Sequence, residues 1–494
     1  MAIPKVMGTE TEYGIAAAGQ PDFNPVLSSS MLISSYAGSL RKIRWDYEDE
    51  SPMRDARGFE PQPGREMSDE DLGLANVILP NGARYYVDHA HPEYSTPECL
   101  SPRALVVHDK AGERILERSL EVLAAEMPQA PRISIYKNNS DGKGNSYGTH
   151  ENYLVDRATP FADIVRDLTP FFVSRQIFTG AGKVGFEGSW DDRTAAGYQL
   201  TARADFFETE VGLETTLKRP IINTRDEPHA DPERYRRLHV IVGDANRCEV
   251  AMFLKVGTTA IVLKMIEDGF LPDFSLVNPV QAIHEVSRDL DLALEIELID
   301  GRRMSALQLQ LEYLELARKY VDREDDTPDN REVIGRWESV LEGLRSDPMS
   351  LAGQLDWAAK LRVLEGYRER DGLGWGDPKL RAIDLQYHDV RRDKGLYDRL
   401  AAAGKVERLA TDDEVDRAVM EPPEDTRAFF RGRCISRYPD AIAAASWDSV
   451  ILDAGRESLQ RVPMREPLKG TRAHVEELLD ASPTAAELVD RLQA

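Results

Sequence analysis

The alternation of polar and apolar residues predicts several β-strands in the first half of the chain. Residues 5–17, 83–87, 133–138 and 147–155 show this pattern, and 184–206 and 237–251 contain similar runs. Because successive side chains of a strand point to opposite faces, polar residues two positions apart lie on the same face. Four of these segments carry such polar pairs. The pattern therefore predicts strands that present a polar face.

Apolar residues at helical spacing predict helices elsewhere. Residues 101–127 have this spacing and are followed by Pro128, so we expect a helix that packs on the sheet. The pattern is mainly helical from about residue 258 onward, and residues 471–494 predict a final helix. Three apolar stripes predict structural helices: Leu307, Leu311, Leu314, Ala317 and Val321; Val333, Trp337, Val340 and Leu344; Leu355, Ala358, Leu361 and Leu364.

Two changes in composition suggest how the chain is organised. Residues 42–80 are rich in charge and proline and include Trp45 and Tyr47, so we expect a long loop there, which is usually functional or disordered. A second change, around Glu421-Pro-Pro-Glu424, predicts a large domain over residues 1–420 and a small C-terminal domain over 421–494. Residues 447–452 predict a strand in the small domain.

The overall charge and the cysteine content exclude several classes of function. The 494 residues include 62 Lys and Arg against 86 Asp and Glu, a formal net charge of −24. This balance argues against nucleic acid or anionic lipid as a partner. No run approaches the roughly 20 apolar residues of a membrane helix. Cys99, Cys248 and Cys434 form no paired motif, so we expect a cytoplasmic protein without a disulfide framework or a zinc site.

Residues 81–98 hold the densest group of reactive side chains. Asn81-Gly82 predicts a turn, because both residue types tolerate positive φ. The strand that follows places a cation, a phenol and a carboxylate on one face, those of Arg84, Tyr86 and Asp88. We expect Pro92 to end this strand. The segment looks like a site and not like part of a core.

Asp88 is the first candidate for catalysis in this segment. It is flanked by His89 and His91 and is followed by Glu93. An acid at the end of a strand can simply anchor a turn. A carboxylate in such surroundings can equally attack an acyl carbon or take a proton from water.

Glu10 and Glu12 form a second polar pair on one strand face. Exposed strands often carry acids, so a solvated face is one explanation. However, Gly8 lies nearby and permits a ligand to approach the backbone. Mg²⁺ usually binds one or two carboxylates together with nucleotide phosphates. A cradle for a nucleotide and its metal ion is the alternative.

His150 and His239 lie on two further polar strands. Each is either a buried histidine with satisfied hydrogen bonds or a metal ligand. A zinc protease motif is absent, because His150-Glu-Asn-Tyr is followed by Leu154.

The usual glycine-rich nucleotide loops are missing as well, and residues 180–185 are best explained as a turn. A nucleotide must therefore be held by strands, with Arg84 and Arg237 as contacts to the phosphates. Trp447 either stacks on a base or packs in a core.

Four motifs carry a resemblance to a known family: Gly8-Thr-Glu-Thr-Glu-Tyr-Gly14, Arg84-Tyr-Tyr-Val-Asp-His-Ala-His-Pro-Glu-Tyr-Ser-Thr-Pro-Glu98, Gln354-Leu-Asp-Trp-Ala-Ala-Lys360 and Ile383-Asp-Leu-Gln-Tyr-His-Asp-Val390. They closely resemble the Pup ligase and depupylase family, over nearly the whole chain. That family is related to glutamine synthetase. The resemblance implies an α+β fold, in which an antiparallel sheet forms a cradle packed with helices, plus a small C-terminal domain.

Two features resemble the depupylase branch of this family. One is Asp88-His-Ala-His-Pro92, where the ligase pattern is similar to Asp-Val-Gly-Ser-His-Pro. The other is the insertion that contains residues 44–52 and 54–59, which is similar to a loop that the ligase lacks.

The resemblance also implies roles for individual residues. Asp88 would be the catalytic residue. Near Mg²⁺ it implies Glu10, Tyr86, Glu93, His150 and His239, of which the histidines would be further ligands or phosphate neighbours. At the nucleotide it implies Gly8, Thr9, Glu10, Thr11, Glu12, Arg84, Thr96, Pro97, Asn152, Arg237 and Trp447.

The activity implied by the resemblance is hydrolysis of side-chain amides of Pup, a small protein modifier. The chain would deamidate the C-terminal glutamine of Pup and cleave the isopeptide bond between Pup and lysine. Cofactors would be Mg²⁺ and ATP, or ADP with phosphate, and the partners would be Pup and pupylated proteins. Two alternatives stay open: a Pup–protein ligase and a non-catalytic protein that binds Pup or nucleotide.

Overall fold

The structure is a computed structural model that describes residues 2–17, 19–20, 23–38, 43–48, 50–58, 74–187 and 196–493. Its centre is a six-stranded antiparallel sheet in the order β13-β8-β1-β6-β5-β4. These strands are β1 (Met7–Glu12), β4 (Asn76–Ile78), β5 (Arg84–Asp88), β6 (His91–Ser95), β8 (Thr149–Asp156) and β13 (Tyr235–Val240).

The register of this sheet places the polar pairs on one face. Glu10 lies opposite His150 on one side and opposite Ser95 on the other, while Glu12 lies opposite Glu93. On the outer strands, Tyr86 pairs with Glu93, and His239 pairs with Asn152. The predicted polar face is thus confirmed, and five adjacent strands contribute to it.

Helices cover the other face of the sheet. Tyr85, Val87 and Tyr94 are buried against α1 (Pro25–Gly38) and α3 (Pro102–Glu126). The side chain of Ser101 caps α3 at its N-terminus, so the helix predicted over residues 101–127 is confirmed. Because the helices bury this face, the polar side chains of the opposite face are left to form the cradle.

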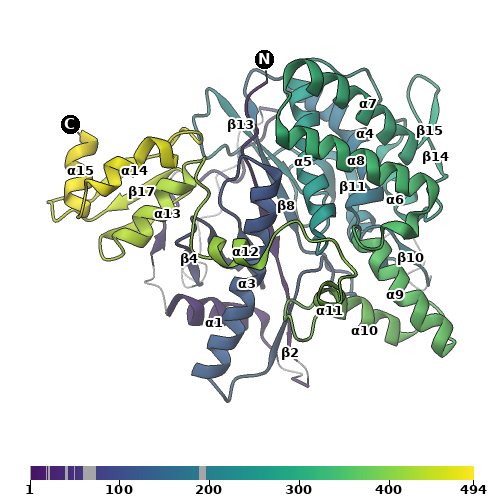
Figure 1. The fold of residues 1–494 in the computed structure, drawn as a ribbon, viewed down its shortest axis with the longest axis horizontal. Helices are drawn as coiled ribbons and strands as arrows, with labels where there is room; N and C mark the ends of the chain where they lie inside the picture. Colours follow the sequence, from purple (N-terminus) through teal and green to yellow (C-terminus); the bar gives the residue numbers. More distant parts are fainter. Residues whose placement is uncertain are drawn as a thin grey trace.

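The largest apolar core lies among helices of the middle of the chain, which gather on one side of the molecule (Figure 1). The three apolar stripes fall on α7, α8 and α9, as predicted. The helices of this core are α4 (Phe161–Thr179), α5 (Glu249–Glu267), α6 (Pro279–Arg288), α7 (Ala306–Glu324), α8 (Pro328–Ser346), α9 (Asp356–Asp371), α10 (Pro378–Tyr387) and α11 (Leu396–Ala402). A further helix, α12 (Asp412–Ala418), packs on α3.

The C-terminal part lies at the opposite end of the molecule and has a core of its own (Figure 1). Its helices are α13 (Ala428–Arg437), α14 (Arg472–Asp480) and α15 (Ala485–Gln493). Its sheet has the order β18-β17-β16-β3, with β16 (Ile442–Ala445), β17 (Ser449–Leu452) and β18 (Gln460–Pro463). The strand β3 (Arg44–Trp45) comes from far upstream and pairs in parallel with β16. The boundary at residue 420 stays a prediction.

The remaining strands form small two-stranded sheets. They are β2 (Gly14–Ala17) with β7 (Ile133–Tyr136), β9 (Lys183–Val184) with β10 (Tyr198–Gln199), β11 (Phe207–Gly212) with β12 (Arg219–Asn223), and β14 (Glu295–Glu297) with β15 (Arg303–Ser305). Two 3₁₀ helices cover Ala204–Phe206 and Pro348–Leu351. Among the described residues, no helix has both the length and the apolar character needed to cross a membrane.

Pro92 does not end a strand, contrary to the prediction. It lies inside β6, directly opposite Val87 of β5. Val87 N–H donates to the Ala75 carbonyl, on the side of β5 that faces away from β6. The Pro92 carbonyl accepts from Tyr13 N–H, on the side of β6 that faces away from β5. The missing N–H of proline therefore costs the β5–β6 ladder no hydrogen bond. The reactive segment is a hairpin that turns at His89 and Ala90.

Several predicted elements have different bounds. The strand predicted over residues 5–17 is divided between β1 and β2, which belong to different sheets. Of the run predicted over 237–251, only 237–240 belong to a strand, the end of β13, and α5 begins at Glu249. Between 184 and 206 the described residues hold the last residue of β9, the whole of β10 and a 3₁₀ helix, and residues 188–195 lie outside the described residues.

The last helix is two helices, because Pro483 intervenes and Thr484 forms a new cap with Glu487. The predicted loop over 42–80 contains β3 and β4 near its two ends, and residues 59–73 lie outside the described residues.

A pair of helix glycines tests the packing of α3 on the sheet. A Cβ on Gly112 would lie 2.4 Å from the ring of Tyr94, whereas a Cβ on Gly366 in α9 would meet nothing within 4 Å. Alanine normally stabilises a helix interior by about 0.5–1 kcal/mol relative to glycine. We expect Gly366→Ala to show this gain and Gly112→Ala to destabilise by about 1–3 kcal/mol through overpacking. Urea unfolding measures both, and a gain for both variants would contradict the packing.

Candidate active site

The polar face of the central sheet holds two groups of side chains that can bind a metal ion. Glu10, His150 and His239 form the first group, and Glu12, Asp88 and Glu93 form the second. Within each group the candidate ligand atoms lie within 4.8 Å of one another. The two groups share β1, because Glu10 and Glu12 are two residues apart on it.

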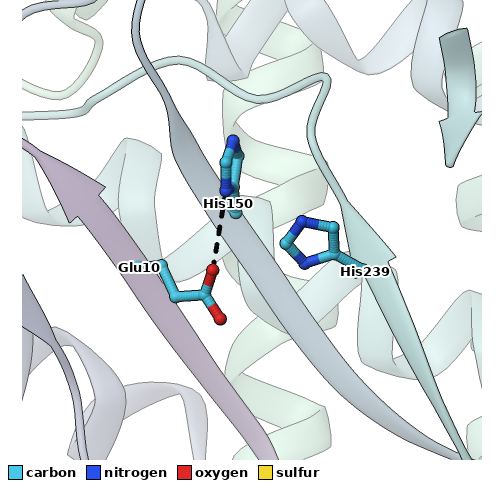
Figure 2. Close-up of side chains that lie close together, drawn as sticks. All are labelled: Glu10, His150 and His239. Carbon is cyan, nitrogen blue, oxygen red and sulfur yellow. Dashed lines mark ion pairs between the residues drawn. The ribbon is translucent and has the colours of Figure 1, made fainter. Parts of the chain in front are cut away.

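The first group comes from three neighbouring strands, β1, β8 and β13, and its side chains point toward one another (Figure 2). His150 Nδ1 lies 3.5 Å from Glu10 Oε2, and the rings of His150 and His239 are 4.8 Å apart, edge to face. Burial alone would raise the pKa of Glu10. The hydrogen bond with His150 and the neighbouring side chains of His239 and Arg237 outweigh it, so the pKa lies well below its ordinary value.

The environment of His239 favours the neutral imidazole. Burial holds its pKa well below the ordinary value of 6.5. Its Nδ1 lies 3.2 Å from Asn152 Oδ1, while its Nε2 is buried and has no hydrogen-bond partner among the described residues. A buried nitrogen without a partner costs free energy unless a ligand uses its lone pair.

The second group is built from three carboxylates. Glu12 accepts hydrogen bonds from Gly148 N–H at 2.7 Å and interacts with His91 Nδ1 at 3.1 Å. Glu93 is 2% exposed and accepts a hydrogen bond from Tyr86 Oη at 2.6 Å. Burial raises the pKa of Glu93 well above its ordinary value, and the charges of Asp88, Glu12 and Glu10 add to this effect. Negative charge thus accumulates around Glu93.

Asp88 lies at the outer end of this group, where β5 ends. Its side chain is 39% exposed, and its Oδ2 lies 3.1 Å from His89 Nδ1. Packing around the carboxyl opposes ionisation, but the hydrogen bond and charge of His89 hold the pKa of Asp88 below its ordinary value. His89 has a φ of 51°, which is unusual for a residue other than glycine. The tight turn therefore presents an ionised carboxylate at the rim of the cradle.

Both groups fit a divalent cation. The all-oxygen set of Glu12, Asp88 and Glu93 suits Mg²⁺. The set around Glu10 adds the lone pair of a neutral, buried His239. Tyr86 donates its hydroxyl hydrogen to Glu93, and burial raises the pKa of its phenol well above 10.0, so the phenol is uncharged. In this arrangement Tyr86 would not bind a cation directly but would orient Glu93, which binds it.

A cleft beside the first group spans about 580 Å³, part of which is open to solvent. One wall is the sheet and the other is the C-terminal part, so the cleft joins segments that are far apart in sequence. Of the predicted nucleotide contacts, the cleft is lined by Gly8, Thr9, Glu10, Thr96, Asn152, Arg237 and Trp447. Thr96 Oγ1 accepts a hydrogen bond from Thr9 N–H at 3.0 Å.

The other predicted nucleotide contacts lie outside the lining of this cleft. Glu12 belongs to the second metal group, and Thr11 is buried, with a hydroxyl that has no partner among the described residues. Pro97 follows Thr96 directly. Arg84 lies between two aromatic rings, with its guanidinium carbon 3.9 Å from the ring centres of Trp45 and Tyr86.

The residues of the cleft lining that sequence reasoning missed include Glu98, His229 and Arg427. Glu98 Oε1 accepts from Arg427 Nε at 2.8 Å and from Arg431 at 3.1 Å, and its Oε2 accepts from Arg431 again. Arg427 also donates to the His229 carbonyl, and Arg431 to the Trp447 carbonyl. Glu98 is the last residue of the motif of residues 84–98, and this position was the one sign in the sequence that it belongs to the site. Its two partners lie more than 300 residues away, and nothing in the sequence pairs them.

A family model described as Pup-ligase protein matches residues 5–451. The chain belongs to this family. The resemblance seen in the sequence is therefore confirmed.

Relatives in the Pup-ligase family match over different lengths. The chain is 59% identical to the depupylase of Acidothermus cellulolyticus and 53% identical to the Pup deamidase/depupylase of Mycolicibacterium smegmatis, in each case over 99% of both chains. It is 44% identical to the Pup–protein ligase of Acidimicrobium ferrooxidans, over 82% of this chain and 89% of the ligase.

Two solved structures of the Pup ligase PafA share the fold. One is a complex between Pup and PafA, with a TM-score of 0.82 and 32% identity over 99% of this chain and 94% of that chain. The other is PafA in complex with ADP, with a TM-score of 0.75 and 34% identity over 88% of this chain and 99% of that chain. The predicted fold class is confirmed.

The pairing of Glu98 with two arginines predicts a pH-dependent contribution to stability. Burial alone would raise the pKa of Glu98, but Arg431 and Arg427 lower it from 4.5 to about 2. The carboxylate therefore stabilises the fold above pH 4.5, and this contribution is lost as the pH falls toward 2. We expect Glu98→Gln to destabilise by about 3 kcal/mol at pH 7, since two buried guanidinium groups lose their counter-charge.

The difference between the wild type and Glu98→Gln should shrink as the pH is lowered from 4.5 to 2, as measured by urea unfolding at each pH. Glu424→Gln removes an ion pair with Arg472 that is exposed at the surface, and we expect a change below about 1 kcal/mol. A constant difference across this pH range would show that Glu98 is not held ionised by the arginines.

The raised pKa of Glu93 predicts that metal binding releases a proton. Below that pKa, which lies above the ordinary 4.5, an incoming Mg²⁺ must displace the proton from the carboxyl group. Mg²⁺ affinity of the nucleotide-free protein should therefore increase with pH by up to about tenfold per unit. Calorimetry in buffers of different ionisation enthalpy measures the released protons. An affinity and an enthalpy that depend on neither pH nor buffer would contradict this expectation.

Proposed function

We propose that this chain is a Pup deamidase and depupylase that uses Mg²⁺ and ATP as cofactors. It hydrolyses the side-chain amide of a C-terminal glutamine of Pup, and it cleaves the isopeptide bond between Pup and a substrate lysine. Both reactions break the bond between an acyl carbon and an amide nitrogen, so one acyl site serves for both.

The observation that carries this proposal is the extent of the match to proteins with these activities. The depupylase of Acidothermus cellulolyticus matches over 99% of both chains at 59% identity, while the ligase match is weaker and shorter. The Asp88-His-Ala-His turn supports the same choice, because it provides an ionised acid beside a histidine at the rim of the cradle.

Asp88 is the residue that we assign to catalysis. Hydrolysis of an amide needs an oxygen nucleophile at the acyl carbon and a proton on the leaving nitrogen. The Asp88 carboxylate either attacks this carbon or takes a proton from the attacking water. The acyl carbon gains an oxygen that derives from water, and the nitrogen leaves as ammonia from glutamine or as a lysine amine from a pupylated protein.

The residues beside Asp88 would hold the cofactors. Glu10, Glu93, His150 and His239 are the proposed neighbours of the metal, and Tyr86 orients Glu93. Mg²⁺, when bound, would supply positive charge that stabilises phosphate oxygens and a developing oxyanion.

We place ATP, or ADP with phosphate, in the cleft between the sheet and Trp447. There Gly8 lets a ligand approach β1, and Arg237 faces the metal group. The ADP complex of the related ligase supports nucleotide binding by this fold.

The related structures support Pup as the partner, and the free cysteines support a cytoplasmic location. Pup is the bound protein in the related ligase structure, and we propose Pup and pupylated proteins as the partners here. Cys99, Cys248 and Cys434 are free thiols, as expected for a protein of the reducing cytoplasm.

Replacement of Asp88 tests the catalytic assignment. We expect Asp88→Asn to lower the deamidation rate by at least about 10³-fold, since neither nucleophilic attack nor proton abstraction is left. Nucleotide affinity, measured by calorimetry, should stay within a factor of about three, because Asp88 lies outside the cleft. Mass spectrometry of glutamine-ended Pup measures the reaction. Asp300→Asn, in an exposed turn far from the cradle, is the control and should keep full activity.

The same assay separates the three functions considered for this family. Conversion of glutamine to glutamate with slow consumption of ATP supports the deamidase. Formation of lysine conjugates from glutamate-ended Pup, with one ADP per conjugate, would show a ligase instead. Binding of Pup or nucleotide without either product would show a non-catalytic protein.

A further inference from the structure

Asn152 of β8 contacts three different residues of the cradle. Its Nδ2 donates to Glu10 Oε1 at 3.0 Å, and its Oδ1 accepts from Arg237 Nη1 at 2.7 Å. The same Oδ1 lies 3.2 Å from Nδ1 of His239. This position follows from the register, since Asn152 lies opposite His239 of β13, and Glu10 is only two residues beyond its partner on β1.

The partners of Asn152 fix the orientation of its amide. A guanidinium group has only donors, so the amide atom that faces Arg237 must be the oxygen. An ionised carboxylate has only acceptors, so the atom that faces Glu10 must be the NH₂ group. A flipped amide would place NH₂ against the guanidinium and oxygen against the carboxylate. Both contacts exclude that flip independently.

The amide orientation in turn fixes the tautomer of His239. Because Asn152 presents an oxygen, which cannot donate, the hydrogen of this contact must belong to Nδ1 of His239. Nε2 of His239 is buried and has no hydrogen-bond partner among the described residues, so a hydrogen on Nε2 would be unsatisfied. The contacts therefore favour a ring with its one hydrogen on Nδ1 and a bare lone pair on Nε2. The ring faces His150 and Glu10 (Figure 2).

We propose that Asn152 is a positioning residue that selects the Nδ1–H tautomer of His239 and so prepares Nε2 to bind a divalent cation. It also holds Glu10 and Arg237 in place on the two flanking strands. This inference rests on the proposed function only in that the cation is the Mg²⁺ of the nucleotide site. It gives Asn152 a role through its protein partners, in addition to its place in the lining of the cleft.

The tautomer can be measured in the metal-free protein without substrate. Nitrogen NMR of protein labelled with ¹⁵N-histidine distinguishes the two tautomers, and His239→Gln identifies the resonances of His239. In the wild type we expect a neutral ring with the hydrogen on Nδ1. Asn152→Leu removes the acceptor, so the Nδ1–H form should lose its dominance. Asn152→Asp loses the donor to Glu10 but keeps an oxygen acceptor for Nδ1, so Nδ1 should keep its hydrogen.

Metal affinity provides a second measurement. We expect Asn152→Leu to weaken Mn²⁺ binding at one site by about 10–100-fold, the usual effect of removing a residue that orients a metal ligand. Electron paramagnetic resonance of free Mn²⁺ measures this, with Mg²⁺ as competitor. His239→Gln should weaken the same site. Asn145→Leu is the matched control, because Asn145 donates to Asp141 in the exposed turn before β8, and it should change neither measurement.

Two results would overturn the inference. One is a wild-type His239 that carries its hydrogen on Nε2 or on both nitrogens at pH 7. The other is an Asn152→Leu variant that keeps both the Nδ1–H form and wild-type Mn²⁺ affinity. Thermal unfolding shows whether each variant is folded. If the Asn152→Leu variant does not fold, the Asn152→Asp variant still tests the inference. Neither measurement uses Pup or ATP, so failure of the proposed amidase activity is detected separately.

Discussion

Four carboxylates packed on one face of a sheet are the constraint on which the site depends. Glu10, Glu12, Asp88 and Glu93 repel one another, and the fold offsets this charge residue by residue. Glu10 contacts Asn152, Arg237 and His150. Glu12 accepts a hydrogen bond from Gly148 N–H and lies against His91. Asp88 pairs with His89. Glu93 has the neutral Tyr86 as its hydrogen-bond partner, and its pKa is raised. A divalent cation is the group that would remove the remaining repulsion.

The rest of the structure keeps this arrangement in place. Helices α1 and α3 bury the far face of the sheet, so the strands cannot shift register without exposing that core. The C-terminal part closes the cleft through Glu98, which holds two arginines of the segment around α13. Those arginines bond to the carbonyls of His229 and Trp447. One carboxylate at the end of the reactive motif thus links the sheet to the opposite wall of the cleft.

Prediction from the sequence succeeded where the pattern was local. The stripes of α7, α8 and α9 and the helix after Ser101 follow from periodicity and capping. The shared faces of Glu10 with Glu12, and of Tyr86 with Asp88, follow from strand alternation. Prediction failed where a tertiary contact outweighed a local signal. Pro92 stays in a strand because its missing N–H has no partner to lose in the β5–β6 ladder, and residues 44–45 join the C-terminal sheet through pairing with β16.

The sequence by itself determined which chemical groups are available, which of them share a strand face, and to which family the motifs are similar. The tertiary structure decided which strands are neighbours, and therefore that Glu10 meets His150 and His239, that Glu98 meets Arg427 and Arg431, and that Asn152 lies between three cradle residues. The reason is physical: alternation is fixed by the backbone of one strand, but pairing between distant segments depends on the burial and hydrogen bonding of the whole sheet.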